Sequence, residues 1–342
     1  MHRPHLAGNA ELRRGAERRR VVLTAATALM SVLLAAQPAQ AEPSSLPPEL
    51  GYNYSEIEPP RTAAMGGGLR AFSNSVEALY NNPANMAATR IYHMGGNVQF
   101  WPQANRQSYS AAAVDSIVSR SHLAGGIAVA YTRQDPDGLD RSALDVRLGL
   151  AFPFSEQFLL GGTARYASIT QSGSPSGTLL LPPSSASAGL ASDSIVRGFT
   201  FAGGLTLKPM PELSFAVVGE NLTDPGHGFL PLTLGGAAGY GTPDFTIEAD
   251  VVADFTTYAD TALRAMGGLE YLAGDSYPLR IGYRFDEGLD AHAVSGGVGY
   301  VSREFSFDLS VRQVVTKPLS TAIFVGFKYH FESTGIGTGS SF

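Results

Sequence analysis

Three aspartates in one short stretch, Asp135, Asp137 and Asp140, have the spacing closest to that of a cation site. Carboxylate oxygens at alternate positions are typical Ca²⁺ ligands, and calcium loops need a glycine for their sharp turn. Here Gly138 stands at the wrong position for an EF-hand loop. A plain turn is the alternative, because Asp, Pro and Gly favour turns. We favour the turn and predict neither a bound metal nor a cofactor.

A histidine flanked by two glycines, His227, is a candidate base for a hydrolase. A base of this kind needs a nucleophile, and the sequence lacks the G-x-S-x-G motif that positions a catalytic serine. The chain has no cysteine, which excludes thiol catalysis, zinc–thiolate sites and disulfides. We predict that the protein is not an enzyme, and an outer-membrane lipid hydrolase stays a third alternative.

Charged residues in the C-terminal part occur at alternate positions of apolar segments. In 303–312, for example, Phe305, Phe307 and Leu309 alternate with Ser306 and Asp308. This period of two places the two sets on opposite faces of a strand. The charges predicted to line an interior are Arg264, Glu270, Arg280, Arg284, Asp308, Arg312, Lys328 and His330. Their mixed signs favour ion-pair networks, and binding of a ligand carboxylate by an arginine is the alternative.

The elements that position these charges are strands. From residue 91 onward the sequence repeats segments of about ten residues with period-two alternation, separated by turn residues. The expected strands are 91–101, 106–117, 122–132, 141–152, 156–168, 195–207, 212–220, 230–240, 243–254, 262–272, 276–285, 291–301, 303–312 and 320–331. Their length and even number suit an all-β fold, a closed 14-stranded antiparallel transmembrane β-barrel.

Charge and connection lengths support the membrane interpretation over a soluble β-sandwich, which would bury the aromatic face instead. A one-residue slip in register would turn charges to lipid, at about 2–4 kcal/mol for each basic residue at mid-depth. Every second connection between strands is mostly shorter than its neighbours. This is expected if the first strand starts in the periplasm, because barrels of this class have short periplasmic turns and longer outer loops.

Beyond residue 41 the chain has 18 basic and 28 acidic residues, a net charge of −10 that disfavours nucleic acid as a partner.

The two ends have their own signals. Residues 1–41 carry an arginine-rich start, an apolar stretch and an A-x-A site at 39–41, which predicts a cleaved signal peptide. Residues 332–342 are rich in Gly, Ser and Thr and are predicted to be a flexible tail. Just before this tail, 326–331 has the Gly-x-x-aromatic-x-aromatic spacing that resembles the signal read by the barrel-assembly machinery. The pattern departs at Phe324, where a polar residue is expected.

Residues 42–90 do not alternate and precede the strands, so we predict that they form a plug inside the barrel. Side chains alone do not fill a barrel well above eight strands. The segment contains Gly66, Gly67 and Gly68, then Phe72, and then the stretch that begins Asn81-Asn82-Pro83-Ala84-Asn85. It resembles the N-terminal hatch of FadL-type transporters for fatty acids and other hydrocarbons, which has a Gly-rich stretch and an Asn-Pro-Ala-Gly-like signature. Fourteen strands is also the count of that family.

The resemblance implies passive uptake of hydrophobic molecules such as long-chain fatty acids, by a monomer in the bacterial outer membrane, gated by the hatch. In that family the exit is a gap beside a kinked third strand, where Gly125-Gly126 stands here. Similar glycine pairs recur along the chain, so we favour a plainer interpretation: small residues clear space for the plug. Leu179, Leu180 and Leu181, in the long connection 169–194, are candidates for capture of a hydrophobic solute, and a loop folded on the rim is the alternative.

A second interpretation treats the barrel as a binder of exported or surface proteins. The sequence Gly219 to Pro225 resembles a strand end in the shuttle proteins of type IX secretion, which are related to the same family. The expected partners are therefore outer-membrane lipids and a hydrophobic ligand, with an exported protein as the alternative.

Overall fold

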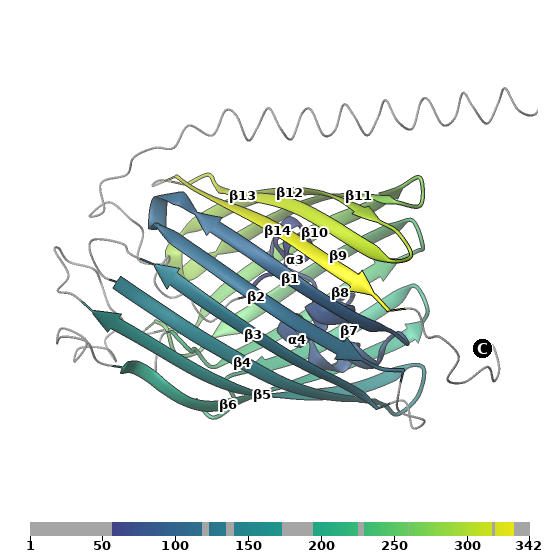
Figure 1. Ribbon diagram of the computed structural model, residues 1–342, viewed down its shortest axis with the longest axis horizontal. Helices are drawn as coiled ribbons and strands as arrows, with labels where there is room; N and C mark the ends of the chain where they lie inside the picture. Colours follow the sequence, from purple (N-terminus) through teal and green to yellow (C-terminus); the bar gives the residue numbers. More distant parts are fainter. Residues whose placement is uncertain are drawn as a thin grey trace, which may run out of the picture.

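The chain forms a closed antiparallel barrel in the computed structural model, which describes residues 57–117, 123–134, 140–172, 194–224, 229–258, 260–316 and 319–331 (Figure 1). Each strand pairs with its neighbours in sequence, and β1 pairs with β14 to close the wall. The strands are β1 Tyr92–Trp101, β2 Arg106–Asp115, β3 Ala124–Gln134, β4 Asp140–Pro153, β5 Phe158–Ser172, β6 Ser194–Met210, β7 Leu213–Glu220, β8 Thr233–Gly241, β9 Phe245–Asp254, β10 Ala262–Ala273, β11 Tyr277–Asp286, β12 Ala291–Val301, β13 Phe305–Val314 and β14 Ser320–His330. The prediction of a 14-stranded barrel is confirmed.

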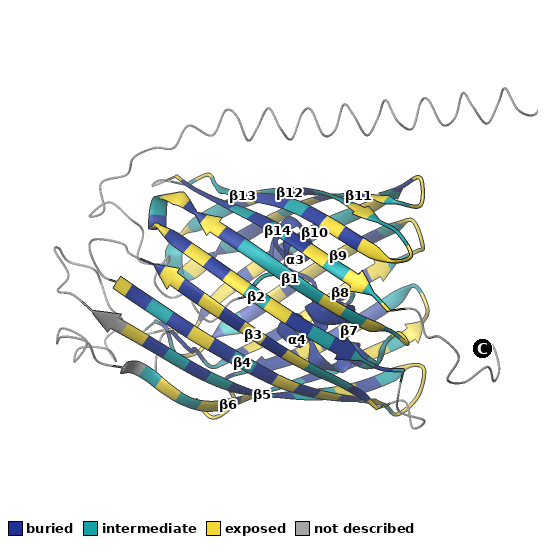
Figure 2. Cartoon of the chain, viewed as in Figure 1, coloured by how far each residue is buried: buried dark blue, intermediate teal, exposed yellow. Residues whose placement is uncertain are grey.

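Buried and exposed residues alternate along most of the strands (Figure 2). In β9, Ile247 and Val251 are 47% and 50% exposed, whereas Glu248 and Asp250 between them are buried. The apolar side chains are therefore on the outside and the charged ones inside. In a soluble protein the arrangement would be reversed, because apolar side chains on the outside would be in contact with water instead of lipid. No helix among the described residues is long and apolar enough to cross a membrane.

Strands β4 to β6 are longer than their sequence pattern indicates. Pairing of β5 with β6 continues to Thr170 opposite Ser194, past a shift in register at Ile169. The added residues are mostly small or polar, so they extend the backbone ladder without continuing the apolar alternation. By contrast, β7 has 8 residues and pairs with β6 mainly between Gly203 and Leu207. The barrel wall is therefore of unequal height.

Short helical segments before β1 lie inside the barrel (Figure 1). They are α3 Pro60–Ala64, η3 Ser75–Glu77, α4 Ala78–Asn81 and η4 Pro83–Ala87. Nearly all of their residues are buried, although helices this short are unstable alone in water. Two further 3-10 segments, η5 Pro102–Ala104 and η7 Glu287–Leu289, belong to connections between strands. The prediction of a plug is confirmed for the described residues 57–90, which we call the plug.

Several predictions fall on residues that lie outside the described part of the chain. These are the signal peptide, residues 42–56 of the hatch, the candidate calcium ligands Asp135 and Asp137, His227, the leucines 179–181 and the tail 332–342. Among the described residues, no group of three or more His, Cys, Asp or Glu is placed to hold a metal ion.

Candidate functional site: the lumen and its plug

The plug is tied to one side of the wall by buried ion pairs. Arg61 of α3 makes a two-point contact with Glu270 of β10, with Nη2–Oε1 and Nε–Oε2 distances of 2.7 and 2.9 Å. The same carboxylate accepts a hydrogen bond from Nε of Arg280. Nη1 of Arg280 donates to Asp308 at 2.6 Å. Burial would lower the pKa of the Arg61 guanidinium, but Glu270 and other nearby carboxylates raise it above its usual value. The guanidinium therefore stays charged.

A second ion-pair cluster holds the start of the plug. The Glu58 carboxylate lies between two wall arginines, with Oε1 3.3 Å from Nη1 of Arg284 and Oε2 2.5 Å from Nη1 of Arg312. Burial alone would raise the pKa of Glu58, but the guanidinium groups of Arg312 and Arg284 outweigh burial and hold the pKa below its usual value. Glu58 is thus an anionic anchor at neutral pH.

Two more contacts complete this anchoring. Lys328 of β14 donates to Glu77 of η3 at 2.6 Å, and Arg70 lies 3.1 Å from Asp250 of β9. Next to Asp250, the Glu248 carboxylate accepts the backbone N–H groups of residues 71 and 72, at 2.6 and 3.0 Å. All these wall partners belong to β9–β14. We call this half of the lumen the charged side.

The predicted interior charges all face the lumen. Glu270, Arg280, Arg284, Asp308, Arg312 and Lys328, described above, contact the plug or one another. Arg264 is buried as well, and it lies 3.6 Å from Asp254 and 3.9 Å from Asp286 of the wall. His330, half-buried at one end of the barrel, stacks on His93 with ring centroids 4.2 Å apart. Sequence reasoning missed Glu58, Glu77, Glu248 and Asp250 as site residues. Glu248 and Asp250 carried a signal, since they alternate with apolar residues in the ninth expected strand.

The three glycines of the hatch shape the turn after α3. Gly66 and Gly67 have φ angles of +77° and +90°, which side chains other than glycine rarely adopt. A Cβ at Gly66 would also lie 2.4 Å from the carbonyl oxygen of Tyr283 in β11. Gly68 is close to Asp250. The glycines therefore let the plug backbone touch the wall.

The Asn-Pro part of the hatch signature fastens the other end of the plug. Asn82 caps η4 by accepting the N–H of Ala84 at 3.1 Å, and its amide donates to Thr206 of β6 at 2.8 Å. Asn81 donates to Thr62 at 2.7 Å, within the plug. Asn85, the last residue of the quoted signature, accepts a hydrogen bond from Thr206 at 2.7 Å.

Phe72 and the backbone at Pro83 pack against glycines of the wall. A Cβ at Gly161 of β5 would lie 2.5 Å from the backbone of Pro83, and one at Gly239 of β8 would lie 2.8 Å from the ring of Phe72. Phe324, the departure from the C-terminal pattern, is fully buried in a cluster with Ala63 of the plug and Trp101. An apolar residue suits this inward position because the plug, rather than water, covers it.

The side of the plug toward β2–β4 is apolar. Leu79 and Met86 are both buried, in a cluster with small wall residues that carry no charge. The wall members of this cluster are Ala112, Val114, Ala124, Ala128, Ala130 and Ala151. One charged residue of β4 reaches this cluster: Arg147 donates a hydrogen bond of 3.4 Å to the carbonyl oxygen of Leu79, and its guanidinium carbon lies 5.1 Å from the centre of the Tyr80 ring. We call this half of the lumen the apolar side.

The glycine pair Gly125-Gly126 lies in β3, on the apolar side. Its inward member, Gly126, faces the plug, and a Cβ there would lie 2.9 Å from both Leu79 and Met86. Pairing of β3 with β2 and with β4 continues through both glycines without a shift in register. In this conformation the wall is closed at the predicted kink, and Gly126 makes room for the plug.

Two hollows on the outer surface of the wall meet at this glycine pair. One, of about 370 Å³, lies over β2 and β3, and its lining includes Tyr92 and Ile127. The other, of about 670 Å³, extends over β3–β6 and is bordered by Leu148, Leu150 and Phe201. The wall is thin and apolar here.

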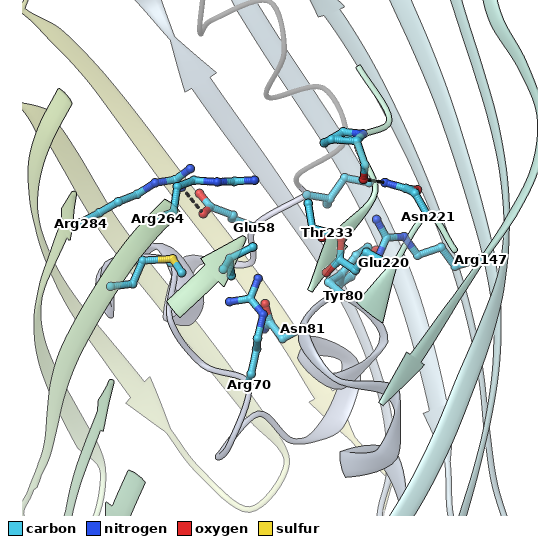
Figure 3. A pocket seen from close by; sticks show the side chains of 15 residues that line it. Glu58, Arg70, Tyr80, Asn81, Arg147, Glu220, Asn221, Thr233, Arg264 and Arg284 are labelled. Atoms are coloured by element: carbon cyan, nitrogen blue, oxygen red, sulfur yellow. Dashed lines mark hydrogen bonds and ion pairs between the residues drawn. The ribbon is translucent and has the colours of Figure 1, made fainter. Parts of the chain in front are cut away.

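The interior itself holds little empty space. A cavity of about 40 Å³ above the plug is lined by charged and polar residues, among them Arg70, Arg147, Glu220 and Arg264 (Figure 3). This volume is room for a few water molecules. Phe229, which carries the guanidinium of Arg141 over its ring, is buried near the ends of β4 and β5. A second cavity, of about 280 Å³, lies toward the other end of the barrel, and its lining combines the charged residues Arg61, Glu270, Arg280 and Lys328 with apolar residues such as Phe245.

No protein-family model and no curated protein matches the chain. Solved structures of outer-membrane channels do match it. The CymD monoaromatic hydrocarbon channel is 14% identical, with a TM-score of 0.63, and the match covers 82% of this chain and 99% of the CymD chain. The chain has the FadL-type fold. The toluene transporter TbuX of Ralstonia pickettii (12% identity, TM-score 0.59, 81% and 99% coverage) and a FadL homologue of Pseudomonas aeruginosa (14%, 0.56, 80% and 98%) also match. The TM-scores show a shared barrel fold, and at 12–14% identity the likeness shows the fold alone.

Proposed function

We propose that the protein is an outer-membrane channel for passive uptake of hydrophobic molecules such as long-chain fatty acids, gated by the plug and exported with a cleaved signal peptide. The observation that carries the proposal is the division of the lumen. Ion pairs fix the plug to β9–β14, whereas its contacts with β2–β4 are mainly with Ala, Val and Gly, beside one hydrogen bond from Arg147 to the plug backbone. A hydrophobic molecule that enters among these Ala, Val and Gly contacts breaks none of the ion pairs that anchor the plug, so the cost of an unpaired charge does not arise.

The exit that we propose is lateral, through the wall beside β3 at Gly125-Gly126. Two hollows on the outer surface meet there, and a bilayer would cover both. Glycine backbone offers no side chain to obstruct such a passage. On the outside, capture by Leu179, Leu180 and Leu181 remains part of the proposal. A fatty-acid carboxylate would find guanidinium groups in the polar cavity above the plug, with Arg70 and Arg264 in its lining.

Uptake of labelled oleate tests the proposal, in cells of a strain without other hydrocarbon channels. Cells that carry the protein should accumulate oleate faster than cells with an empty vector. Equal rates, with the folded barrel present in the outer membrane, would contradict transport.

The second candidate function is binding of exported or surface proteins. The plug favours it, because it occupies much of the lumen and charged residues line both described cavities beside it. Affinity purification from cells that secrete normally distinguishes the two functions. A specific exported protein retained at equimolar amount, together with no oleate uptake, would support the binding function.

A further inference from the structure

The cavity of about 280 Å³ lies between the plug and the wall, at the end of the barrel where β1 begins and β14 ends. In the predicted topology this end faces the periplasm. Asn74 of the plug, with Pro243 and Asp244 of the connection between β8 and β9, forms an exposed rim. A small molecule in the periplasm can therefore reach this cavity, which we call the inner cavity.

The charges that line the inner cavity are mainly positive. Three cations of the ion-pair network on the charged side belong to its lining, namely Arg61, Arg280 and Lys328. These cations contact the carboxylates of Glu77, Glu270 and Asp308, and of these three only Glu270 belongs to the lining. The rim adds one exposed carboxylate, which water and salt screen. An anion in the cavity therefore meets three cations and one carboxylate of the network.

One hydroxyl in the lining is buried without a hydrogen bond to any described residue. Ser306 of β13 is 2% exposed, and its Oγ has no partner in the described part of the chain. Most buried polar groups are hydrogen-bonded, because an unpaired one costs free energy. An oxygen atom of a bound molecule would supply the missing partner.

Lys328 offers a second donor next to Ser306. The two residues pair directly across the β13–β14 ladder and both line the cavity, which places their side chains side by side. The ammonium group of a lysine has three N–H donors. The contacts of Lys328 with Glu77 at 2.6 Å and with Asp308 at 3.7 Å occupy two of them at most. One carboxylate can therefore accept hydrogen bonds from Ser306 and Lys328 together.

Apolar side chains complete the inner cavity. Leu272 of β10 pairs with Pro278 of β11 across the ladder, and Val301 of β12 belongs to the same lining. The volume of the cavity is slightly below the range of about 300–1,000 Å³ that is typical of pockets for small molecules. Its occupant is therefore small, with one ring or a short chain beside its charged group.

We propose that the inner cavity binds a small monocarboxylate with an apolar body, such as an aromatic acid of one ring, which enters from the periplasm. The carboxylate accepts hydrogen bonds from Ser306 and Lys328, and the apolar body packs against Leu272, Pro278 and Val301. This binding site is additional to the proposed transport function, since it lies on the charged side of the plug and opens to the periplasm.

Binding at this site is coupled to the plug. Arg61 and Ser75 of the plug line the inner cavity together with residues of the wall. A ligand that contacts both parts is bound only while the plug is seated, so it stabilises the seated plug, and the stabilisation grows with the concentration of the ligand. The acid thus acts from the periplasm as a ligand that holds the plug in place.

Equilibrium dialysis of labelled benzoate against the purified protein in detergent tests the site. Wild-type protein should bind about one benzoate, and benzamide, the uncharged analogue, should bind about tenfold more weakly, because it loses the charge-assisted hydrogen bonds. Ser306→Ala should raise the Kd for benzoate about tenfold or more, since a hydrogen bond to a charged group is lost. Ser306→Leu, which fills the cavity, should abolish binding.

Ser320→Ala is the matched control. Ser320 of β14 is 1% exposed and its Oγ likewise has no described partner, but it lies at the other end of the barrel. Neither alanine variant loses a hydrogen bond to a described residue, so both should fold, as heat-modifiable electrophoretic mobility checks. The Kd of Ser320→Ala should equal the wild-type value.

Coupling to the plug is measured by the fluorescence of Trp101, which packs against Ala63 of the plug, during a urea titration. Benzoate should shift plug release to higher urea in wild type and in Ser320→Ala, and should cause no shift in Ser306→Leu. Saturable binding without any shift in wild type would overturn the coupling.

The binding site itself is overturned if wild-type protein shows no saturable binding of benzoate, which would leave water as the occupant of the cavity. It is also overturned if wild type, Ser306→Ala and Ser306→Leu have the same Kd. Equal Kd values for benzoate and benzamide would overturn a carboxylate as the ligand. None of these measurements depends on oleate uptake, so failure of this site and failure of the transport function are distinguished.

Discussion

Arg61 in the plug and Glu270 in β10 are joined by two parallel hydrogen bonds across the lumen, a fork-to-fork ion pair. Both side chains are largely buried, at 10% and 14% exposure. Removing one partner of a buried pair leaves an uncompensated charge, which costs far more than the pair contributes at a surface. This relationship identifies the charged side as the fixed attachment of the plug.

Arg61→Met should weaken plug attachment by about 1.5–3 kcal/mol, because the change removes charged hydrogen bonds to Glu270, which keeps Arg280 as a partner. The single tryptophan, Trp101, packs against Ala63 of the plug and reports plug release by its fluorescence in a urea titration. Arg133→Met is the matched control: the Arg133–Asp140 pair is more than half exposed, so its loss should cost about 0–1 kcal/mol. Equal shifts in the two variants would contradict the anchoring role.

Plug attachment should weaken below about pH 4.5. The guanidinium groups of Arg312 and Arg284 lower the pKa of Glu58 from its ordinary value of 4.5 in the folded protein. A carboxyl with a lowered folded-state pKa contributes stability above its unfolded pKa and loses it as pH falls through the folded value. Trp101 fluorescence in urea at pH 7 and at stepwise lower pH measures the change. In Glu58→Gln this part of the pH dependence should be absent, and an unchanged pH profile would count against the assignment.

Gly282→Val should expel the plug while the barrel remains. A Cβ at Gly282 of β11 would lie 2.2 Å from the backbone nitrogen of Gly66, and neither backbone can yield easily. Gly236→Val in β8 is the control, because a Cβ at Gly236 has no neighbour within 4 Å. Trypsin cleavage after Arg70 in native protein reports plug exposure. Protection of Arg70 in Gly282→Val would be inconsistent with the tight contact.

Asn82→Ala should destabilise the end of the plug by about 1 kcal/mol for the lost cap, and further for the lost bonds to β6. Asn82→Asp keeps an acceptor for the N–H of Ala84 but loses the donor to Thr206. Hydrogen exchange at the Ala84 amide separates the two effects. The amide should exchange faster in Asn82→Ala than in Asn82→Asp, and equal exchange would show that the cap contributes nothing.

The fold follows from the sequence because a membrane imposes a simple rule on each strand. Phe305 and Asp308 can face opposite sides in one register only, so period-two alternation fixes both the strand and its inner face. The ends of β5 and β6 did not follow from it, since backbone pairing continues beyond the apolar alternation to Thr170 and Ser194. Where a strand extends beyond the lipid, its length depends on pairing with the neighbouring strand, and the hydropathy pattern of the sequence does not show it.

The plug was predictable as a segment but its contacts were not. Glu58 stands in a proline-rich stretch, and its partners Arg284 and Arg312 are more than 220 residues away. The division of the lumen into a charged and an apolar side was not predictable either, because it depends on which wall residues Leu79 and Met86 contact, namely Gly126 and Gly149. The recurring glycine pairs were the sequence signal for these contacts. The interpretation that small residues clear space for the plug agrees with the contacts of Gly126. The wall is closed at this glycine pair, so a lateral opening stays a proposal.

The central claim is that the plug stays fixed on the charged side while solutes pass on the apolar side. A disulfide between Gly68→Cys and Asp250→Cys tests it, in a chain with no other cysteine. A Cβ at Gly68 would lie 3.3 Å from the Cβ of Asp250 in β9, close to the separation of about 3.5–4.5 Å in disulfides, so a bridge would hold the plug to the wall there. Mass spectrometry should confirm the bridge, and oleate uptake is then measured in oxidised and reduced cells. We predict uptake at the wild-type rate in both states; loss on oxidation, with recovery on reduction, would show that the whole plug leaves its seat.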